Sequence, residues 1–206
     1  MNSLLLKEKW LEAAGIYTDN GDQLWSDIER KYTGSNRYYH NLQHLHDMYT
    51  LLHDYYKGDV PFITLIALFY HDFEYNTLRN DNEQRSAAHA VSVMQAWNAD
   101  TKLAKQVSDM ILATANHHGE ISDTELNTFL DADMAVLGFE SPLYKRYASC
   151  VKQEFNAYPE FIFNRGRRQF IERVLERDFI YATSFFRQQF EVQARINLQN
   201  ELKSLR

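Results

Sequence analysis

The sequence predicts an all-α protein, and three observations support this prediction. Apolar residues recur every three to four positions along almost the whole chain, as in amphipathic helices, and no segment alternates as a half-buried strand does. Only 7 Gly and 3 Pro interrupt 206 residues, which favours long helices with few sharp turns. A hydrophobic share of 45% with 24% charged residues is typical of a globular protein. We therefore expect one compact helical domain over residues 1–206, with a sizeable buried core.

Ten helices are expected in chain order, the last of them either continuous or broken. Their predicted ranges are residues 3–14, 22–32, 41–57, 61–72, 82–98, 101–117, 123–137, 142–157, 160–176 and 178–203. Pro61 and Pro142 stand at expected helix starts, where the first turn tolerates a residue without an N–H. Residues 122–125 (Ser-Asp-Thr-Glu) have the spacing of a capping box. Glycines stand at three expected helix ends: Gly58, Gly119 and Gly138.

The net charge of −6 and the single cysteine limit the classes of function. An acidic chain does not suggest the basic face on which non-specific nucleic-acid binding relies, so no nucleic-acid partner is expected. Cys150 is the only cysteine, so no intrachain disulfide can form, and the reducing cytoplasm is the expected location. The longest apolar run, residues 61–70, is shorter than the ~20 residues of a membrane span, and no membrane partner is expected.

One His-Asp pair stands in an unusually apolar setting. His71-Asp72 closes the run at residues 61–70, whereas the other two pairs, at residues 46–47 and 53–54, lie on an amphipathic helix. A buried carboxylate without a partner is very costly. A divalent metal is one such partner, because it accepts both imidazole and carboxylate ligands. The other interpretation is a core histidine that bonds to its neighbour.

Helical wheels turn three further polar side chains into apolar arcs. They are His44 on residues 41–57, Glu83 on 82–98 and Asp133 on 123–137, with about 100° between successive residues. Asp131 lies about 200° from Asp133, away from the centre of that arc, so it is expected either to support the ligands from behind or to be a surface acid. Two imidazoles and two carboxylates suit one divalent transition metal, Mn²⁺, Fe²⁺, Ni²⁺ or Zn²⁺, with Mg²⁺ as a further option.

The order His, His-Asp, Asp on separate helices resembles the HD superfamily of metal-dependent phosphohydrolases. Five segments resemble one bacterial subgroup, the predicted metal-dependent HD phosphohydrolases: Tyr-His-Asn-Leu-Gln-His-Leu at 39–45, Ala-Leu-Phe-Tyr-His-Asp at 67–72, Asn-Glu-Gln-Arg-Ser-Ala at 82–87, Ala-Thr-Ala-Asn-His at 113–117 and Asp-Ala-Asp-Met-Ala-Val-Leu-Gly at 131–138. Residues 144–154 and 194–198 are similar too, so the resemblance runs over nearly the whole chain. It implies a single compact HD-type domain over residues 1–206.

The resemblance also implies the site residues. The implied metal ligands are the four side chains that the wheels and the apolar run single out: His44, His71, Asp72 and Asp133. Glu83 matches an Asn-Glu-x-x-Ser pattern of the subgroup, and His117 matches its helix-end histidine. There is one departure. Some HD enzymes place an acid four residues after the motif histidine, where this chain has Tyr75, and the nearest acid is Glu74.

The implied reaction is hydrolysis of a phosphate ester or phosphoanhydride in a nucleotide or a related small phosphorylated molecule. Glu83 is the candidate for moving protons to or from water, although an acid at a helix start needs no function. His117 is the candidate for binding phosphate or protonating the leaving group, and its alternative is a plain helix-terminal cation. His40 and Arg165 are candidates for substrate contacts, although the basic run at 164–168 could equally be a solvated face.

Two other functions compete with hydrolysis. An HD-like module could bind a metal or a nucleotide without turnover. A di-iron carboxylate oxidase is the other class, but it needs Glu-x-x-His on two helices, and no glutamate here has a histidine three residues later. The sequence leaves the oligomeric state open.

Overall fold

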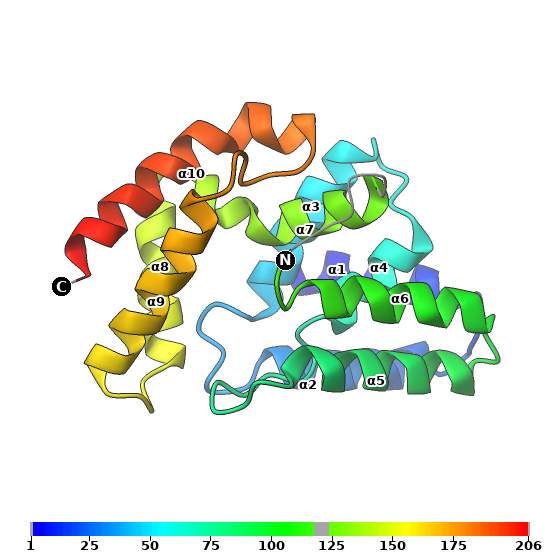
Figure 1. The fold of residues 1–206 in the computed structure, drawn as a ribbon. Coiled ribbons are helices and arrows are strands. Elements are labelled where there is room, and N and C mark those ends of the chain that lie inside the picture. Colours follow the sequence, from blue (N-terminus) through cyan, green and yellow to red (C-terminus); the bar gives the residue numbers. More distant parts are fainter. Residues whose placement is uncertain (1, 118–123, 206) are drawn as a thin grey trace. The chain divides into compact units, whose positions relative to one another are not determined.

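The structure, a computed structural model, describes residues 2–117 and 124–205. In these two stretches the regular elements are all helices, which confirms the predicted all-α class (Figure 1). The helices are α1 Asn2–Ala14, α2 Gly21–Tyr32, α3 Leu42–Tyr55, α4 Phe62–Tyr70, α5 Asn82–Ala96, α6 Thr101–Ala113, α7 Thr124–Met134, the 3₁₀ helix η1 Ala135–Gly138, α8 Ser141–Glu154, α9 Glu160–Leu175 and α10 Ser184–Ser204. The predicted helix end at Gly119 and the first half of the predicted capping box lie outside the described residues.

The chain packs into two compact units, Met1–Gly119 and Glu120–Arg206. The first unit contains α1 to α6, and the second contains α7, η1 and α8 to α10. Each unit has buried apolar side chains of its own. The single HD-type domain expected over residues 1–206 stays a prediction.

Helix α4 is the buried centre of the first unit. It packs on α1, α3, α5 and α6, and its residues 66–70 are all buried. An apolar segment without a charged face gains most free energy when other helices cover it all round. From α1, the Trp10 ring makes edge contacts with Phe69 and Tyr70 at centroid distances of 5.4 and 5.7 Å. In the same unit, α5 and α6 lie side by side (Figure 1).

Several helix ends lie where the sequence predicts them. The Asn41 side chain caps α3 by accepting the Gln43 N–H at 2.8 Å. Gly58 follows α3 with φ of 99°, a left-handed conformation that glycine adopts without strain. Pro61 directly precedes α4, and Pro142 lies in the first turn of α8.

The predicted ranges differ from the observed helices by one or more residues at their ends, and α6 ends at Ala113 rather than at residue 117. Three further differences affect α4, α7 and α10. Helix α4 ends at Tyr70, so His71 and Asp72 lie at the helix end and in the following turn rather than inside a helix. The range 123–137 divides into α7 and η1. Helix α10 begins at Ser184 rather than at residue 178, because the Thr183 hydroxyl caps it by accepting the Phe186 N–H.

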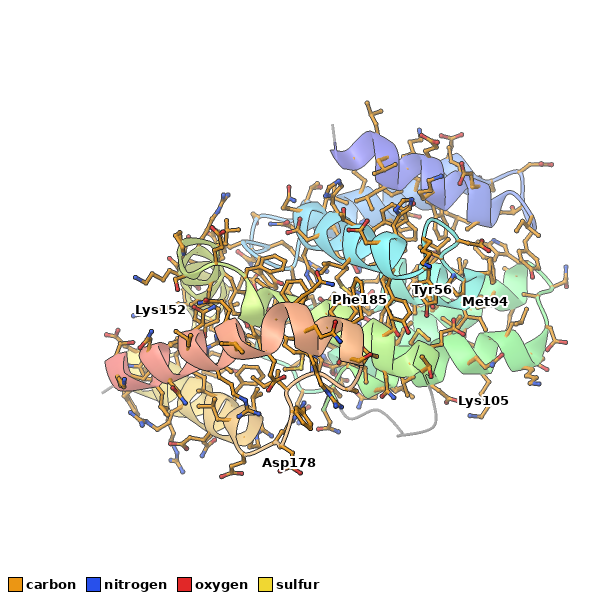
Figure 2. The ribbon with its side chains drawn as sticks, turned by 90° about the horizontal axis from the view of Figure 1, so that it is seen from above. Tyr56, Met94, Lys105, Lys152, Asp178 and Phe185 are labelled. Atoms are coloured by element: carbon orange, nitrogen blue, oxygen red, sulfur yellow. The ribbon has the colours of Figure 1, made fainter. Side chains whose placement is uncertain are left out.

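The second unit is built around η1. Helices α7, α8 and α10 pack on it, and Gly138 lies so close to α10 that an added Cβ would stand 2.5 Å from the Phe190 Cβ. The Asn197 amide of α10 donates to Leu137 O at 2.9 Å and Phe139 O at 2.8 Å. Lys152 of α8, labelled in Figure 2, lies on the outside of this unit, and its ammonium pairs with the Glu160 carboxylate.

Within the two described stretches, no helix is both long enough and apolar enough to cross a bilayer.

Candidate metal centre

The end of α4 presents the His71 ring to the interior of the first unit. The His71 Nδ1 lies 2.9 Å from Leu68 O, one turn back, and the side chain is 1% exposed. A carbonyl oxygen only accepts hydrogen bonds, so Nδ1 carries the proton. The neutral ring therefore has its lone pair on Nε2, which is the arrangement that orients a histidine toward a metal.

His44 meets this ring from α3. The two Nε2 atoms lie 3.1 Å apart, and the His44 side chain is 2% exposed. Two lone pairs cannot face each other at this distance, so either His44 carries a proton on Nε2 or a cation is shared between the rings. The inward direction predicted for His44 is confirmed.

Asp72 completes a compact trio with the two histidines. Its Oδ2 lies 3.2 Å from His71 Nε2 and 3.9 Å from His44 Nε2, and its side chain is 17% exposed. Metal bonds of about 2.0–2.2 Å with angles of roughly 90–110° place neighbouring ligand atoms roughly 2.8–3.6 Å apart. Two of the three separations in the trio fall in this range, and the third needs a wider angle. The donor set therefore fits a divalent metal, and His44 and His71 belong to a group of side chains able to hold one.

The other two His-Asp pairs lack this arrangement. His46 Nδ1 lies 3.8 Å from its neighbour Asp47, and His53 Nδ1 lies 3.9 Å from Asp54. The His53 and Asp54 side chains are 48% and 66% exposed. The apolar setting led to His71-Asp72 as the candidate pair, and its side chains are indeed less exposed than those of His53 and Asp54.

Glu74 is engaged in ion pairs beside the trio. Its carboxylate lies 2.7 Å from Lys31 Nζ and 3.7 Å from Arg85 Nη2. Burial alone would raise the pKa of Glu74, but the hydrogen bond from Lys31 and the charges of Lys31 and Arg85 hold this pKa below its ordinary value. A carboxylate kept ionised in this way is a poor proton donor.

The candidate proton-transfer residues stay predictions. Glu83 is half-buried in the first turn of α5, and its carboxylate makes no hydrogen bond or ion pair with any residue that the structure describes. His117 follows α6 with φ of 49°, and its N–H donates to Ala113 O at 2.9 Å. The neighbouring His118 lies outside the described residues.

His40 lies in an aromatic cluster at the start of α3. Its ring centroid lies 4.5 Å from that of Tyr75, 5.0 Å from that of Tyr39 and 5.8 Å from that of His44. The structure thus brings His40 near a predicted ligand, while its role toward substrate stays a prediction.

In the second unit, the two aspartates of α7 differ in burial. Asp131 is 4% exposed and accepts hydrogen bonds from Ala182 and Thr183, whereas Asp133 is half-buried in the last turn. Burial raises the pKa of Asp131, and the hydrogen bonds from Thr183 and Ala182 oppose this shift in part. Asp131 is therefore a buried structural acid and not a surface acid, while Asp133 stays a predicted ligand.

The basic run of α9 is largely used inside the second unit. Arg167 is buried, and its Nε lies 2.8 Å from Glu201 Oε1. Arg168 donates to Leu205 O. Arg165 is exposed, and a substrate contact for it stays a prediction.

Comparisons with models of known protein families, with curated proteins and with solved structures give no match. The resemblance to HD phosphohydrolases therefore rests on the residues quoted from this chain. The sequence did not point to Arg37 or Tyr32 as residues of the site. The Tyr32 hydroxyl accepts the Asp72 N–H, and the Arg37 guanidinium donates to the carbonyl of Phe73. Their contacts are with main-chain atoms, which leave no pattern in a sequence.

Proposed function

We propose that this protein hydrolyses a phosphate ester or phosphoanhydride, in a nucleotide or related small molecule, with one divalent transition metal. The observation that carries this proposal is the trio of His44, His71 and Asp72, whose ligand atoms lie 3.1–3.9 Å apart. The resemblance to the HD superfamily supplies the reaction class. Asp133 is proposed as the fourth ligand, because the same resemblance implies it.

Each side chain of the trio has a distinct task in this proposal. His44 and His71 would hold the ion through Nε2, and Asp72 through its carboxylate. The bond from His71 Nδ1–H to Leu68 O fixes the tautomer and the direction of that ring. A bound divalent ion would supply Lewis acidity, which activates water and polarises a phosphoryl oxygen.

Other residues would handle protons and substrate. Glu83 is the proposed group that takes a proton from water, because no basic side chain in the described stretches pairs with its carboxylate. Glu74 is less suited, since the hydrogen bond and charge of Lys31 lower its pKa and make its carboxylate a weaker base. His117 would bind phosphate or protonate the leaving group. His40 and Arg165 are the proposed substrate contacts.

A reconstitution assay tests this function. Protein freed of metal by chelation is supplied with Mn²⁺, Ni²⁺ or Mg²⁺ and offered nucleoside mono-, di- and triphosphates and simple phosphomonoesters. We expect metal-dependent release of phosphate or pyrophosphate from at least one compound, which chelator abolishes. His71→Ala should abolish it too, whereas His53→Ala, an exposed histidine of the same unit, should not.

The same assay separates catalysis from binding alone. If wild-type protein holds about one metal per chain yet turns over nothing in the panel, the proposal of hydrolysis fails. The non-catalytic metal- or nucleotide-binding module then becomes the better description.

A further inference from the structure

The backbone on both sides of Asp72 is held by two side chains that are not candidate ligands. The Asp72 N–H donates to the Tyr32 hydroxyl at 3.3 Å. The carbonyl of the following residue, Phe73 O, accepts from Arg37 Nη2 at 3.0 Å. Arg37 Nη1 also donates to His40 O at 3.0 Å. One guanidinium therefore joins two segments that are distant in sequence.

These two segments carry the candidate ligands. His40 lies four residues before His44, in the turn that leads into α3, and Phe73 directly follows Asp72. The guanidinium thus links the start of the helix that carries His44 to the turn that carries Asp72. A change in that link would alter the separation between the His44 ring and the Asp72 carboxylate.

The guanidinium itself is held in place by aromatic rings. Its Cζ lies 4.7 Å from the Tyr32 ring centroid and 5.0 Å from that of Tyr75. Tyr32 is fully buried at the end of α2, so its ring is a fixed support. A planar fork on a fixed ring can meet two carbonyls at once with little loss of conformational entropy, which a lysine ammonium cannot do.

We propose that Arg37 and Tyr32 are positioning residues that set the geometry of the metal centre. Together they form a brace, here called the Arg37–Tyr32 brace, between the turn before α3 and the turn after α4. This inference rests on the proposed function and deepens it, because the brace acts only through His44 and Asp72. Removing it should weaken metal binding while the candidate ligands remain intact.

Cobalt titration tests the brace without any activity assay. Metal-free wild-type, Arg37→Lys and Tyr32→Phe proteins are titrated with Co²⁺ against a chromophoric chelator, and the visible spectrum of the bound ion is recorded. We expect Arg37→Lys to weaken Co²⁺ binding about 10–100-fold, the usual effect of losing a group that orients ligands. Tyr32→Phe removes only the hydroxyl that accepts the Asp72 N–H, so it should shift the cobalt bands with a smaller loss of affinity.

A matched control separates positioning from general stability. Arg79 also forms a two-pronged contact, with both Asp81 oxygens at 2.6 Å, in the same unit, so Arg79→Lys should bind Co²⁺ as the wild type does. Metal-free Arg37→Lys should unfold thermally within a few degrees of the wild type by far-UV circular dichroism. If Arg37→Lys fails to fold, the cobalt spectrum of Tyr32→Phe shows whether the brace affects the metal centre.

Three outcomes would overturn the inference. Wild-type affinity and spectrum in a folded Arg37→Lys protein would overturn the brace alone. If Arg37→Lys does not fold, an unchanged cobalt spectrum in Tyr32→Phe would likewise overturn the brace alone. A wild-type protein that binds no Co²⁺, Mn²⁺ or Ni²⁺ would overturn the proposed function, and the brace with it.

Discussion

Asp131 accepts two hydrogen bonds from Thr183 through a single oxygen. Its Oδ2 lies 2.7 Å from the Thr183 N and 2.8 Å from the Thr183 Oγ1, while its Oδ1 accepts the Ala182 N–H at 2.8 Å. Thr183 is the N-cap of α10, so this carboxylate fastens α7 to the beginning of α10. The Asp131 carboxylate is therefore used to hold elements of the second unit together.

The two aspartates of α7 should respond differently to the same substitution. We expect Asp133→Asn to lower metal occupancy strongly, because an amide replaces an anionic ligand. Asp131→Asn should keep the metal and lower the free energy of unfolding by about 1–3 kcal/mol, because the N–H groups of residues 182 and 183 lose a charged acceptor. Elemental analysis and urea unfolding measure the two effects. Full occupancy in Asp133→Asn together with loss in Asp131→Asn would reverse our assignment.

Metal content should depend on one His-Asp pair. We expect about one tightly bound transition metal per chain, and we expect His71→Ala or Asp72→Ala to remove most of it, because both side chains belong to the buried trio. His53→Ala and Asp54→Ala should change little, since both side chains are largely exposed. Inductively coupled plasma mass spectrometry on dialysed protein measures the content. Equal losses from the two pairs would show that the wrong pair was chosen.

Glu83→Gln should separate chemistry from metal binding. The substitution keeps the size of the side chain and removes its ability to take a proton, so kcat should fall by roughly 10²–10⁴-fold while metal content is retained. Single-turnover kinetics with metal analysis on the same sample measures both. Gln84→Glu is a control, because it adds an acid one position away on an exposed face. Unchanged turnover in Glu83→Gln would make Glu83 a structural acid.

Acid should weaken the second unit through a buried ion pair. Burial would raise the pKa of Glu201, but the hydrogen bond and charge of Arg167 outweigh it, so the pKa is lowered in the folded state. A lowered carboxyl pKa contributes stability above the unfolded value of about 4.3 that is lost as pH falls through the folded value. Glu201→Gln should therefore cost roughly 3 kcal/mol or more at pH 7 and much less at acid pH.

Urea unfolding at pH 7 and at about pH 3 or below, followed by far-UV circular dichroism, tests this pH dependence, because the loss is complete only below the lowered pKa. Glu172→Gln is the matched control, because its pair with Arg168 spans 3.7 Å and both side chains are more than 40% exposed. The explanation fails if Glu201→Gln and the wild type lose equal stability between the two pH values.

The sequence was informative wherever burial follows from periodicity. The run at 61–70 has no polar face, so its place at the centre of the first unit and the burial of His71 could be predicted. The residue at which α4 ends could not be predicted, because a helix end in an apolar run has no local sequence signal. The burial of Asp131 was also missed, since its partners lie 51 and 52 residues further along the chain. The Arg37 contacts were hidden for the related reason that both of its acceptors are main-chain oxygens.

The edge contacts of Trp10 with Phe69 and Tyr70 have a practical consequence for spectroscopy. All three tryptophans of the chain, Trp10, Trp25 and Trp97, are buried in the first unit, and residues 120–206 contain none. Intrinsic tryptophan emission should therefore follow the unfolding of the first unit alone. Cys150, the single thiol, lies on α8 and is partly exposed, so an environment-sensitive dye attached there reports on the second unit. The native chain thus carries an independent optical probe for each half.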